Sequence, residues 1–175
     1  MSRLVGNLLD MTRLESGVQL RREMCPLEEI IGASLQRMEA QLRGHSVAVH
    51  LPDNLPLVSV DDVLMGQVIV NLVENAVKYT SPGTVIELVA KAYPEVIELS
   101  VLDRGPGFAP GEETRIFDKF YRGRSQGGRG AGLGLAICKA IVAAHQGTIE
   151  AANRPGGGAE FRVRLPLEPS VERPA

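Results

Sequence analysis

Residues 71–79 read NLVENAVKY, a segment in which polar side chains recur at helical spacing. Asn71, Asn75 and Lys78 are four and three residues apart, so on a helix they would share one face. Two amide oxygens could bind Mg²⁺, which prefers oxygen ligands, and the ammonium could meet the phosphates that accompany this ion. A solvated polar stripe explains this single helix equally well, so its meaning depends on the rest of the chain.

The surrounding sequence alternates between helical and strand-like patterns. Apolar residues at helical spacing predict helices at 1–17, 27–42, 62–79 and 132–145, with a shorter helical segment at 112–120. β-type runs predict strands at 18–24, 47–51 and 57–60, and two hairpins, 84–92 with 95–103 and 148–152 with 159–165. Because most strands lie in hairpins, we expect an α+β fold: a two-layer α/β sandwich whose mixed, mostly antiparallel sheet has helices on one face.

Length and charge exclude several classes of protein. The 175 residues suffice for one domain, and a net charge of −2 gives no electrostatic footprint for nucleic acid. No apolar run approaches the ~20 residues that span a bilayer, and no signal-peptide pattern opens the chain, so we expect a cytoplasmic protein. Cys25 and Cys138 lack disulfide or metal-ligand spacing. Thirteen of the 19 glycines lie between Gly105 and Gly158, which indicates backbone close to a ligand or a mobile loop.

Three glycine-rich segments follow the polar helix. In DRGPG (103–107), an aspartate at the end of a strand could accept from an exocyclic amine, while the glycines let a planar base lie against the backbone. In GAGLGL (130–135), glycines open a helix whose N-terminal N–H groups favour an anion. No strand leads directly into that segment and no GxxxxGK[ST] loop occurs, so neither a Rossmann nor a P-loop site is predicted. The three glycines at 156–158 predict a hairpin turn that could also admit a ligand or pack beneath it.

Together these patterns resemble the catalytic ATP-binding domain of bacterial sensor histidine kinases, in the superfamily shared with gyrase B, Hsp90 and MutL. The resemblance covers residues 18–166 and rests on five short motifs. These are an N box (71–79), a first glycine box (103–107), an F box (116–122), a second glycine box (130–135) and a third glycine box (153–166). Within the family, the segments IFDKFYRG, GLGLAICKAIVAAHQGTI and RPGGGAEFRV are most similar to the potassium-responsive sensor kinases.

The resemblance implies a Bergerat-type sandwich that holds ATP and Mg²⁺ between the glycine segments and the N-box helix. It assigns Mg²⁺ binding to Asn71 and Asn75, and contacts with phosphates or ribose to Lys78 and Tyr79. Asp103 would accept from the adenine amine. The remaining implied contacts are Gly105 and Gly107 around the base, and Gly130, Gly132, Leu133 and Gly134 at the phosphates. A mobile lid is implied at 108–131. Arg122 is the candidate for contact with the γ-phosphate, and Arg124 and Arg129 are weaker candidates. Phe117 and Phe120 would anchor the lid on the core and on the partner helix.

The reaction implied by the resemblance depends on the nucleophile. In the related ATPases a glutamate four residues before the Mg²⁺-binding asparagine is associated with activating water, and Asn71 stands at that place here. An amide cannot take a proton at neutral pH, so we expect poor hydrolysis and transfer to an external acceptor, with Asn71, Lys78 and Arg122 as the catalytic candidates. Glu74 lies about 100° away around the helix from Asn75, a less suitable angle for that role.

The family's acceptor is a histidine followed by an acidic residue and a basic-Thr-Pro stretch, and none of the three histidines here fits. We interpret His45 and His50 as loop or edge-strand residues and His145 as a cation at a helix C-terminus. The chain therefore resembles the catalytic half of a kinase: residues 1–17 as a remnant of a dimerisation helix, 18–166 as the ATP-binding domain and 167–175 as a disordered tail. The expected partners are the acceptor-histidine helices of a parent protein anchored in the inner membrane and, indirectly, a response regulator.

Three alternatives remain open. One is a water-using ATPase of the gyrase and Hsp90 type, against which Asn71 argues. Another is a degenerate domain that serves only as an interaction scaffold, against which Asn75, Asp103 and Gly132 argue. A serine kinase with the same fold is the third.

Overall fold

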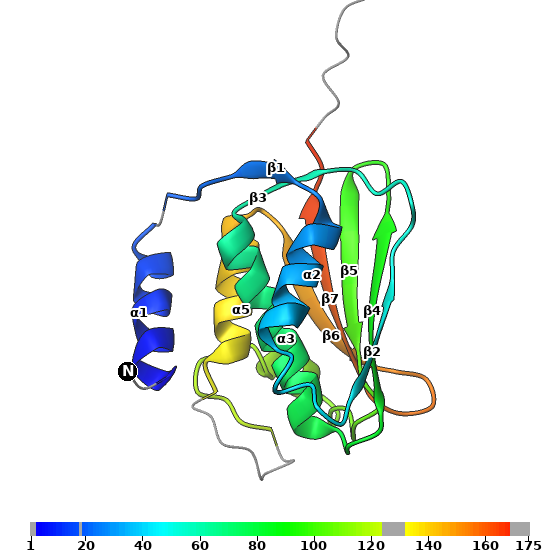
Figure 1. Cartoon of the computed structure of the whole chain (residues 1–175). Helices are drawn as coiled ribbons and strands as arrows, with labels where there is room; N and C mark the ends of the chain where they lie inside the picture. The colour runs from blue at the N-terminus through cyan, green and yellow to red at the C-terminus, as the bar shows by residue number, and fades with distance from the viewer. Residues whose placement is uncertain (1–2, 18, 124–131, 169–175) are drawn as a thin grey trace, which may run out of the picture.

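The computed structural model describes residues 3–17, 19–123 and 132–168 (Figure 1). Five strands form one sheet in the order β2-β4-β5-β7-β6, in which β2 runs parallel to β4 and every other pair is antiparallel. These strands are β2 (Ser46–His50), β4 (Val85–Ala92), β5 (Val96–Leu102), β6 (Thr148–Asn153) and β7 (Ala159–Pro166). A separate antiparallel pair joins β1 (Glu23–Cys25) to β3 (Val58–Val60).

The helices form the second layer. They are α1 (Arg3–Glu15), α2 (Leu27–Arg37), α3 (Asp62–Tyr79), α4 (Glu112–Arg115) and α5 (Gly134–Ala144). Figure 1 shows α2, α3 and α5 on the same face of the sheet, with α1 outside them beside α5. The prediction of an α+β sandwich with a mixed, mostly antiparallel sheet is therefore confirmed. Among the described residues, none of the helices combines the length and the apolar character needed to cross a membrane.

The core lies between the sheet and the helices. Alternate residues of β4 and β7 are buried, including Ile86, Leu88, Phe161 and Val163, as expected for strands with one face against a helical layer. From the other side α3 and α5 contribute fully buried side chains such as Ile69, Leu72 and Ile137. This packing fixes α3 against the sheet, so the remaining face of α3 is turned away from the core.

The opposite face of the sheet carries ion pairs. Glu98 is buried there, but its carboxylate accepts from Arg164 Nε at 2.8 Å and lies 3.6 Å from Arg162 Nε. Arg162 also pairs with Glu160 at 3.0 Å. These neighbours explain why a carboxylate is tolerated at this place, and no ligand site needs to be invoked.

The second helix is shorter than predicted. α2 ends at Arg37, and residues 38–44 form turns, so the predicted helix over 27–42 is wrong for 38–42. Met38 N–H and Glu39 N–H donate to carbonyls three residues back, which tightens the backbone. Met38 and Leu42 still pack on the core, so the helical spacing of apolar residues persists although the helix does not.

Helix α1 packs on α5 through the partly buried Met11 and Leu14. Two polar contacts join α1 to other parts of the domain: Gln67 Nε2 of α3 donates to Asp10 Oδ2 at 3.2 Å, and Lys119 pairs with Glu15. The segment is thus helical as predicted, while its origin in a dimerisation helix stays a prediction. At the other end, Leu167 N–H donates to Glu95 O at 2.8 Å, so one backbone hydrogen bond lies beyond the predicted domain limit of 166.

His145 is not the helix-end cation that the sequence predicted. It is 2% exposed; Nε2 accepts from Asp61 N–H at 3.0 Å, and Nδ1 donates to Ile141 O at 2.8 Å. Because a backbone N–H only donates and a carbonyl only accepts, these contacts require the neutral ring. Burial lowers the pKa of His145 below its ordinary value of 6.5. The ring therefore joins the start of α3 to the end of α5 as an uncharged group.

We expect His145 to make folding pH-dependent. The pKa of His145 is lower in the folded than in the unfolded chain, so as pH falls the unfolded state takes up a proton on this ring first. The stability contributed by the neutral ring is therefore lost as pH falls below about 6.5. Between about pH 7.5 and about pH 5.5 the free energy of unfolding, measured in urea, should fall more for the wild type than for His145→Gln. The variant His50→Gln, at an exposed position of β2, is the control and should keep the wild-type pH slope. Equal slopes for His145→Gln and wild type would contradict this role.

Candidate functional site

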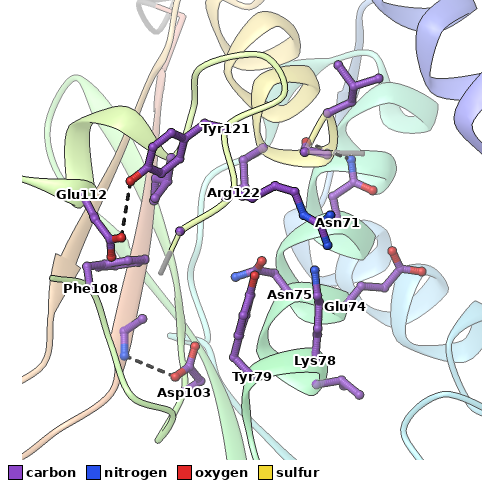
Figure 2. Close-up of a pocket in the computed structure, with 18 of the residues that line it drawn as sticks. Asn71, Glu74, Asn75, Lys78, Tyr79, Asp103, Phe108, Glu112, Tyr121 and Arg122 are labelled. Atoms are coloured by element: carbon purple, nitrogen blue, oxygen red, sulfur yellow. Dashed lines mark hydrogen bonds between the residues drawn. The ribbon is translucent and has the colours of Figure 1, made fainter. Parts of the chain in front are cut away.

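Helix α3 places the predicted polar residues along one side of a cavity of about 580 Å³. Asp61, the residue before α3, caps the helix N-terminus: its Oδ1 accepts from Leu64 N–H at 3.1 Å. With Ile69, Leu72 and Val73 buried, Asn71, Asn75 and Lys78 face the cavity, as Figure 2 shows. The structure thus brings together the N-box residues on one wall.

The side chain of Asn71 is oriented by the second glycine segment. Its Nδ2 donates to Gly134 O at 3.3 Å, at the start of α5. Because the amide nitrogen is engaged there, the amide oxygen is the atom that remains for a ligand. Cys138 lies in the core below, where burial raises the pKa of its thiol to about 12, so it stays protonated and is no nucleophile. Cys25 and Cys138 are both free thiols, as expected.

Asp103 lies at the other end of the cavity. Its Oδ1 accepts two backbone hydrogen bonds, from Gly105 N–H at 2.7 Å and from Ala159 N–H at 3.2 Å. Burial raises the pKa of the Asp103 carboxyl above its ordinary value of 3.8, while these two donors and the charge of Arg154 act in the opposite direction. Both described bonds use Oδ1, so Oδ2 is directed to the cavity as an acceptor with a fixed position.

The glycines of the first glycine box have different roles. Gly107 lines the cavity, whereas Gly105 does not. A Cβ at Gly105 would lie 2.7 Å from Tyr79 O, so this glycine lets the loop approach the end of α3. Gly105 therefore shapes the pocket indirectly, by packing behind Tyr79, which itself lines the cavity. Lys78 Nζ lies 5.1 Å from the centroid of the Tyr79 ring.

The second glycine box lies where α5 begins. Gly132, Leu133 and Gly134 line the cavity, while Gly130, together with Arg124 and Arg129, lies outside the described residues. Gly132 has φ +75°, and a Cβ there would lie 2.7 Å from Tyr121 O. Phe120 N–H donates to Gly132 O at 3.0 Å. The F box and the second glycine box are thus held together by backbone contacts that only glycine permits at this position.

The F box matches its expected role in part. Phe117 is buried and packs edge-on against Phe161, with ring centroids 6.3 Å apart, so the expected anchor on the core is observed. Phe120 is 59% exposed with φ +63°, so it does not anchor the lid on the core, while anchoring on a partner helix stays a prediction. The two residues have helical spacing, but α4 ends at Arg115 and they do not share a helix face. Arg122 lines the cavity, and Figure 2 shows it extended toward Asn71 and Lys78.

Sequence reasoning missed part of the cavity wall. Glu112 is buried; its Oε2 accepts from Ala109 N–H at 2.9 Å, and its Oε1 accepts from Tyr121 OH at 3.3 Å (Figure 2). Arg115 stacks over the Tyr121 ring at 4.8 Å. These contacts fold the segment after Asp103 back over the cavity, and they link residues whose spacing shows no periodicity. Other lining residues without a predicted role in ligand contact are Asn7, Gln41, Glu74, Val77, Pro106, Phe108, Ile116, Gly123, Leu135 and Ala159.

The fold and the cavity are those of a nucleotide-binding module, with the Asp103 carboxylate at one end of the cavity and the amides of Asn71 and Asn75 at the other. Residues 60–169 match the family described as histidine kinase-, DNA gyrase B- and HSP90-like ATPase, and the chain belongs to this family. The match includes α3, Asp103 and both glycine segments that line the cavity.

Within the family, the chain is homologous to the catalytic part of sensor histidine kinases. It is 49% identical over 173 residues to the sensor protein KdpD of Escherichia coli K12. The matched region covers 98% of this chain and 19% of that protein. KdpD of Clostridium acetobutylicum is 37% identical over 170 residues, with coverage of 95% and 19%. The expected subfamily resemblance is confirmed by both relatives. The chain spans about a fifth of the length of these proteins.

Solved structures agree with this assignment. Full-length ShkA in complex with AMPPNP superposes with a TM-score of 0.82 at 31% identity, covering 93% of this chain and 35% of that one. Histidine kinase ThkA in complex with the response regulator TrrA has a TM-score of 0.79 at 24% identity, covering 97% and 49%, and shares the fold. A nucleotide analogue and a response regulator are thus bound by structural neighbours of this domain.

Proposed function

We propose that this domain binds Mg-ATP and transfers the γ-phosphoryl group to a histidine on the dimerisation helices of a longer sensor kinase, for relay to a response regulator. The observation that carries the proposal is the cavity, which has Asp103 at one end and Asn71, Asn75 and Lys78 at the other. On this proposal the domain acts on the cytoplasmic side of a membrane-anchored parent.

The cavity lining supports this orientation of ATP. Asp103 Oδ2 would accept from the adenine amine, because both backbone N–H donors already engage Oδ1. The triphosphate would lie between α3 and the start of α5, where Lys78 and the N-terminal end of the α5 dipole offer positive charge. Arg122 projects over the same region and is the candidate for the γ-phosphate.

The donor set fits a magnesium ion. Asn71 and Asn75 offer neutral oxygens from adjacent turns, and the bond from Asn71 Nδ2 to Gly134 O leaves the oxygen of that amide for the ion. Mg²⁺ is commonly held by one or two protein oxygens together with phosphates and water. Bound there, it would neutralise charge that develops on the phosphates during transfer.

Transfer is favoured over hydrolysis by the residue at 71. An amide takes no proton from water at neutral pH, so the site holds no base at that place, whereas an imidazole nitrogen is itself a nucleophile. Attack by the acceptor nitrogen on the γ-phosphorus forms the N–P bond as the bond to the bridging oxygen of ADP breaks. The domain's residues position the phosphates and stabilise charge during this step.

The acceptor is proposed to lie outside this chain because the three histidines here have other contacts or positions. Both ring nitrogens of the buried His145 are hydrogen-bonded, and Nε2 of His45 pairs with Thr80 Oγ1 at 3.0 Å. His50 lies at the end of β2, followed by Leu-Pro. None has the sequence context of the family's phosphoacceptor.

The test mixes this chain with a separate fragment of its full-length protein that carries the dimerisation helices, in the presence of ATP labelled on the γ-phosphate. Label should appear on the fragment and not on this chain. Asn75→Ala should lower the labelling rate by at least about 100-fold, as expected when a group that stabilises transition-state charge is removed. Lys91→Ala, at an exposed position of β4, is the control and should label the fragment at the wild-type rate.

Other outcomes identify the alternatives. Steady phosphate release by the isolated domain, abolished by Asn75→Ala, would assign it to the water-using ATPases. If no nucleotide raised the melting temperature, the domain would be an interaction scaffold. Label on this chain that survived replacement of all three histidines would contradict an external acceptor.

A further inference from the structure

Asn153, the last residue of β6, makes two hydrogen bonds to one residue 45 positions earlier in the sequence. Its Oδ1 accepts from Phe108 N–H at 2.6 Å, and its Nδ2 donates to Phe108 O at 2.9 Å. The amide thus pairs with the backbone of Phe108 as a neighbouring strand would. Only a side chain that both accepts and donates at this spacing can satisfy both backbone groups.

Phe108 and Gly107, which this amide holds, belong to the wall at the Asp103 end of the cavity (Figure 2). The ring of Phe108 is edge-on to Phe161, with centroids 5.7 Å apart. Gly107 has φ +71°, and a Cβ there would overlap Asn153 Oδ1. The backbone of this segment therefore approaches Asn153 as closely as a glycine allows, and its position depends on that contact.

The same hairpin holds the other end of the segment. Arg154 Nη1 donates to Asp103 O at 3.0 Å, and Ala159 N–H donates to the Asp103 carboxylate at 3.2 Å. Arg154 is itself held by Glu87 of β4 at 3.3 Å. Residues 103–108 are thus held at both ends by 153–159, with Asn153 securing the end that carries Phe108.

We propose that Asn153 is a positioning residue for recognition of the base, which holds the Gly107–Phe108 backbone at the distance from Asp103 that an adenine ring requires. This inference rests on the proposed function, since it takes an adenine nucleotide as the ligand. Asn153 touches no part of the nucleotide itself; it acts through Phe108. Its loss should therefore reduce the preference for adenine over guanine, because the wall on one side of the ring is no longer fixed opposite the Asp103 carboxylate.

An isosteric change separates hydrogen bonding from size. In Asn153→Asp the carboxylate still accepts from Phe108 N–H, but it cannot donate, and an anionic oxygen faces Phe108 O instead. Asn153→Ala removes both bonds without adding repulsion. If the amide acts through its two hydrogen bonds, Asn153→Asp should weaken ATP binding at least as much as Asn153→Ala, although its shape is closer to the wild type.

The experiment measures dissociation constants for Mg-ATP and Mg-GTP by calorimetry, together with the melting temperature, for the 175-residue chain. Both Asn153 variants should bind ATP about 10-fold more weakly than the wild type, which corresponds to the net contribution of roughly one hydrogen bond. The ratio of ATP affinity to GTP affinity should fall by a similar factor. The matched controls Asn54→Asp and Asn54→Ala, at an exposed turn between β2 and β3, should leave both constants unchanged.

Three results overturn the inference. The first is wild-type ATP affinity in Asn153→Asp. The second is an ATP-to-GTP ratio equal to that of the wild type in both variants, which would mean a general effect on stability. The third is a wild-type chain that binds neither nucleotide, and only this result also removes the proposed function.

Discussion

Asp103→Asn is expected to lower the affinity of the domain for ATP by about 100-fold while leaving its melting temperature nearly unchanged. A charge-assisted hydrogen bond contributes roughly 1.5–3 kcal/mol, and each 1.4 kcal/mol is a factor of ten in affinity. The melting temperature should hold because the backbone contacts of Asp103 survive: Asp103 N–H donates to Ala159 O at 2.9 Å, and Arg154 donates to Asp103 O.

The reason for this large effect is the orientation of the side chain. Gly105 N–H and Ala159 N–H both donate to Oδ1, so an asparagine here must direct its oxygen to these donors and its NH₂ to the cavity. The adenine amine would then face a donor instead of an acceptor. A six-keto purine presents an acceptor at the same place, so GTP should lose less affinity than ATP, and the preference between the two should narrow.

Calorimetry with Mg-ATP and Mg-GTP tests this expectation. Lys119→Ala is the control, because Lys119 pairs with Glu15 of α1 and does not line the cavity, so its nucleotide affinity should equal that of the wild type. Equal ATP affinity in Asp103→Asn and Lys119→Ala would contradict the assignment of Asp103 as the base reader.

The sequence predicted the parts of the molecule whose signals are local. The polar face of α3 follows from the spacing of Asn71, Asn75 and Lys78, and the strand pairs follow from hairpins in which both partners are close in sequence. The residues that line the cavity from these segments were found because each belongs to a short motif. Amide spacing on one helix and glycine next to a helix start are properties of a few neighbouring residues.

The remaining features depend on contacts between distant residues. His145 was predicted as a cation because the end of a helix favours positive charge, but Asp61 N–H, 84 residues away, requires the neutral ring. The pairing of Asn153 with Phe108 and that of Glu112 with Tyr121 show no periodicity. Phe120 is exposed, and its N–H donates to the carbonyl of Gly132, a residue of the second glycine box. Such pairings are fixed by the tertiary fold, so a pattern read along one strand or helix does not contain them.

Gly158→Ala is expected to destabilise the domain by about 2–6 kcal/mol. Gly158 is buried with φ +108°, and a Cβ there would overlap the carbonyl oxygen of Asp103. Strain at a backbone conformation that side chains rarely adopt costs about 1–3 kcal/mol, and overpacking against backbone adds a similar amount. The colliding atom belongs to the backbone and accepts from Arg154, so it cannot move without breaking that bond.

The neighbouring glycine separates these two contributions. Gly157 has φ +102°, but nothing lies within 4 Å of the position its Cβ would take, so Gly157→Ala should show the conformational strain alone, about 1–3 kcal/mol. Free energies of unfolding in urea give the difference between the two variants, which measures how tightly the hairpin packs on Asp103. Because the collision displaces Asp103, Gly158→Ala should also lose ATP affinity under conditions in which it remains folded, whereas Gly157→Ala should keep it. Equal destabilisation by the two substitutions would mean that the hairpin does not hold Asp103 in place.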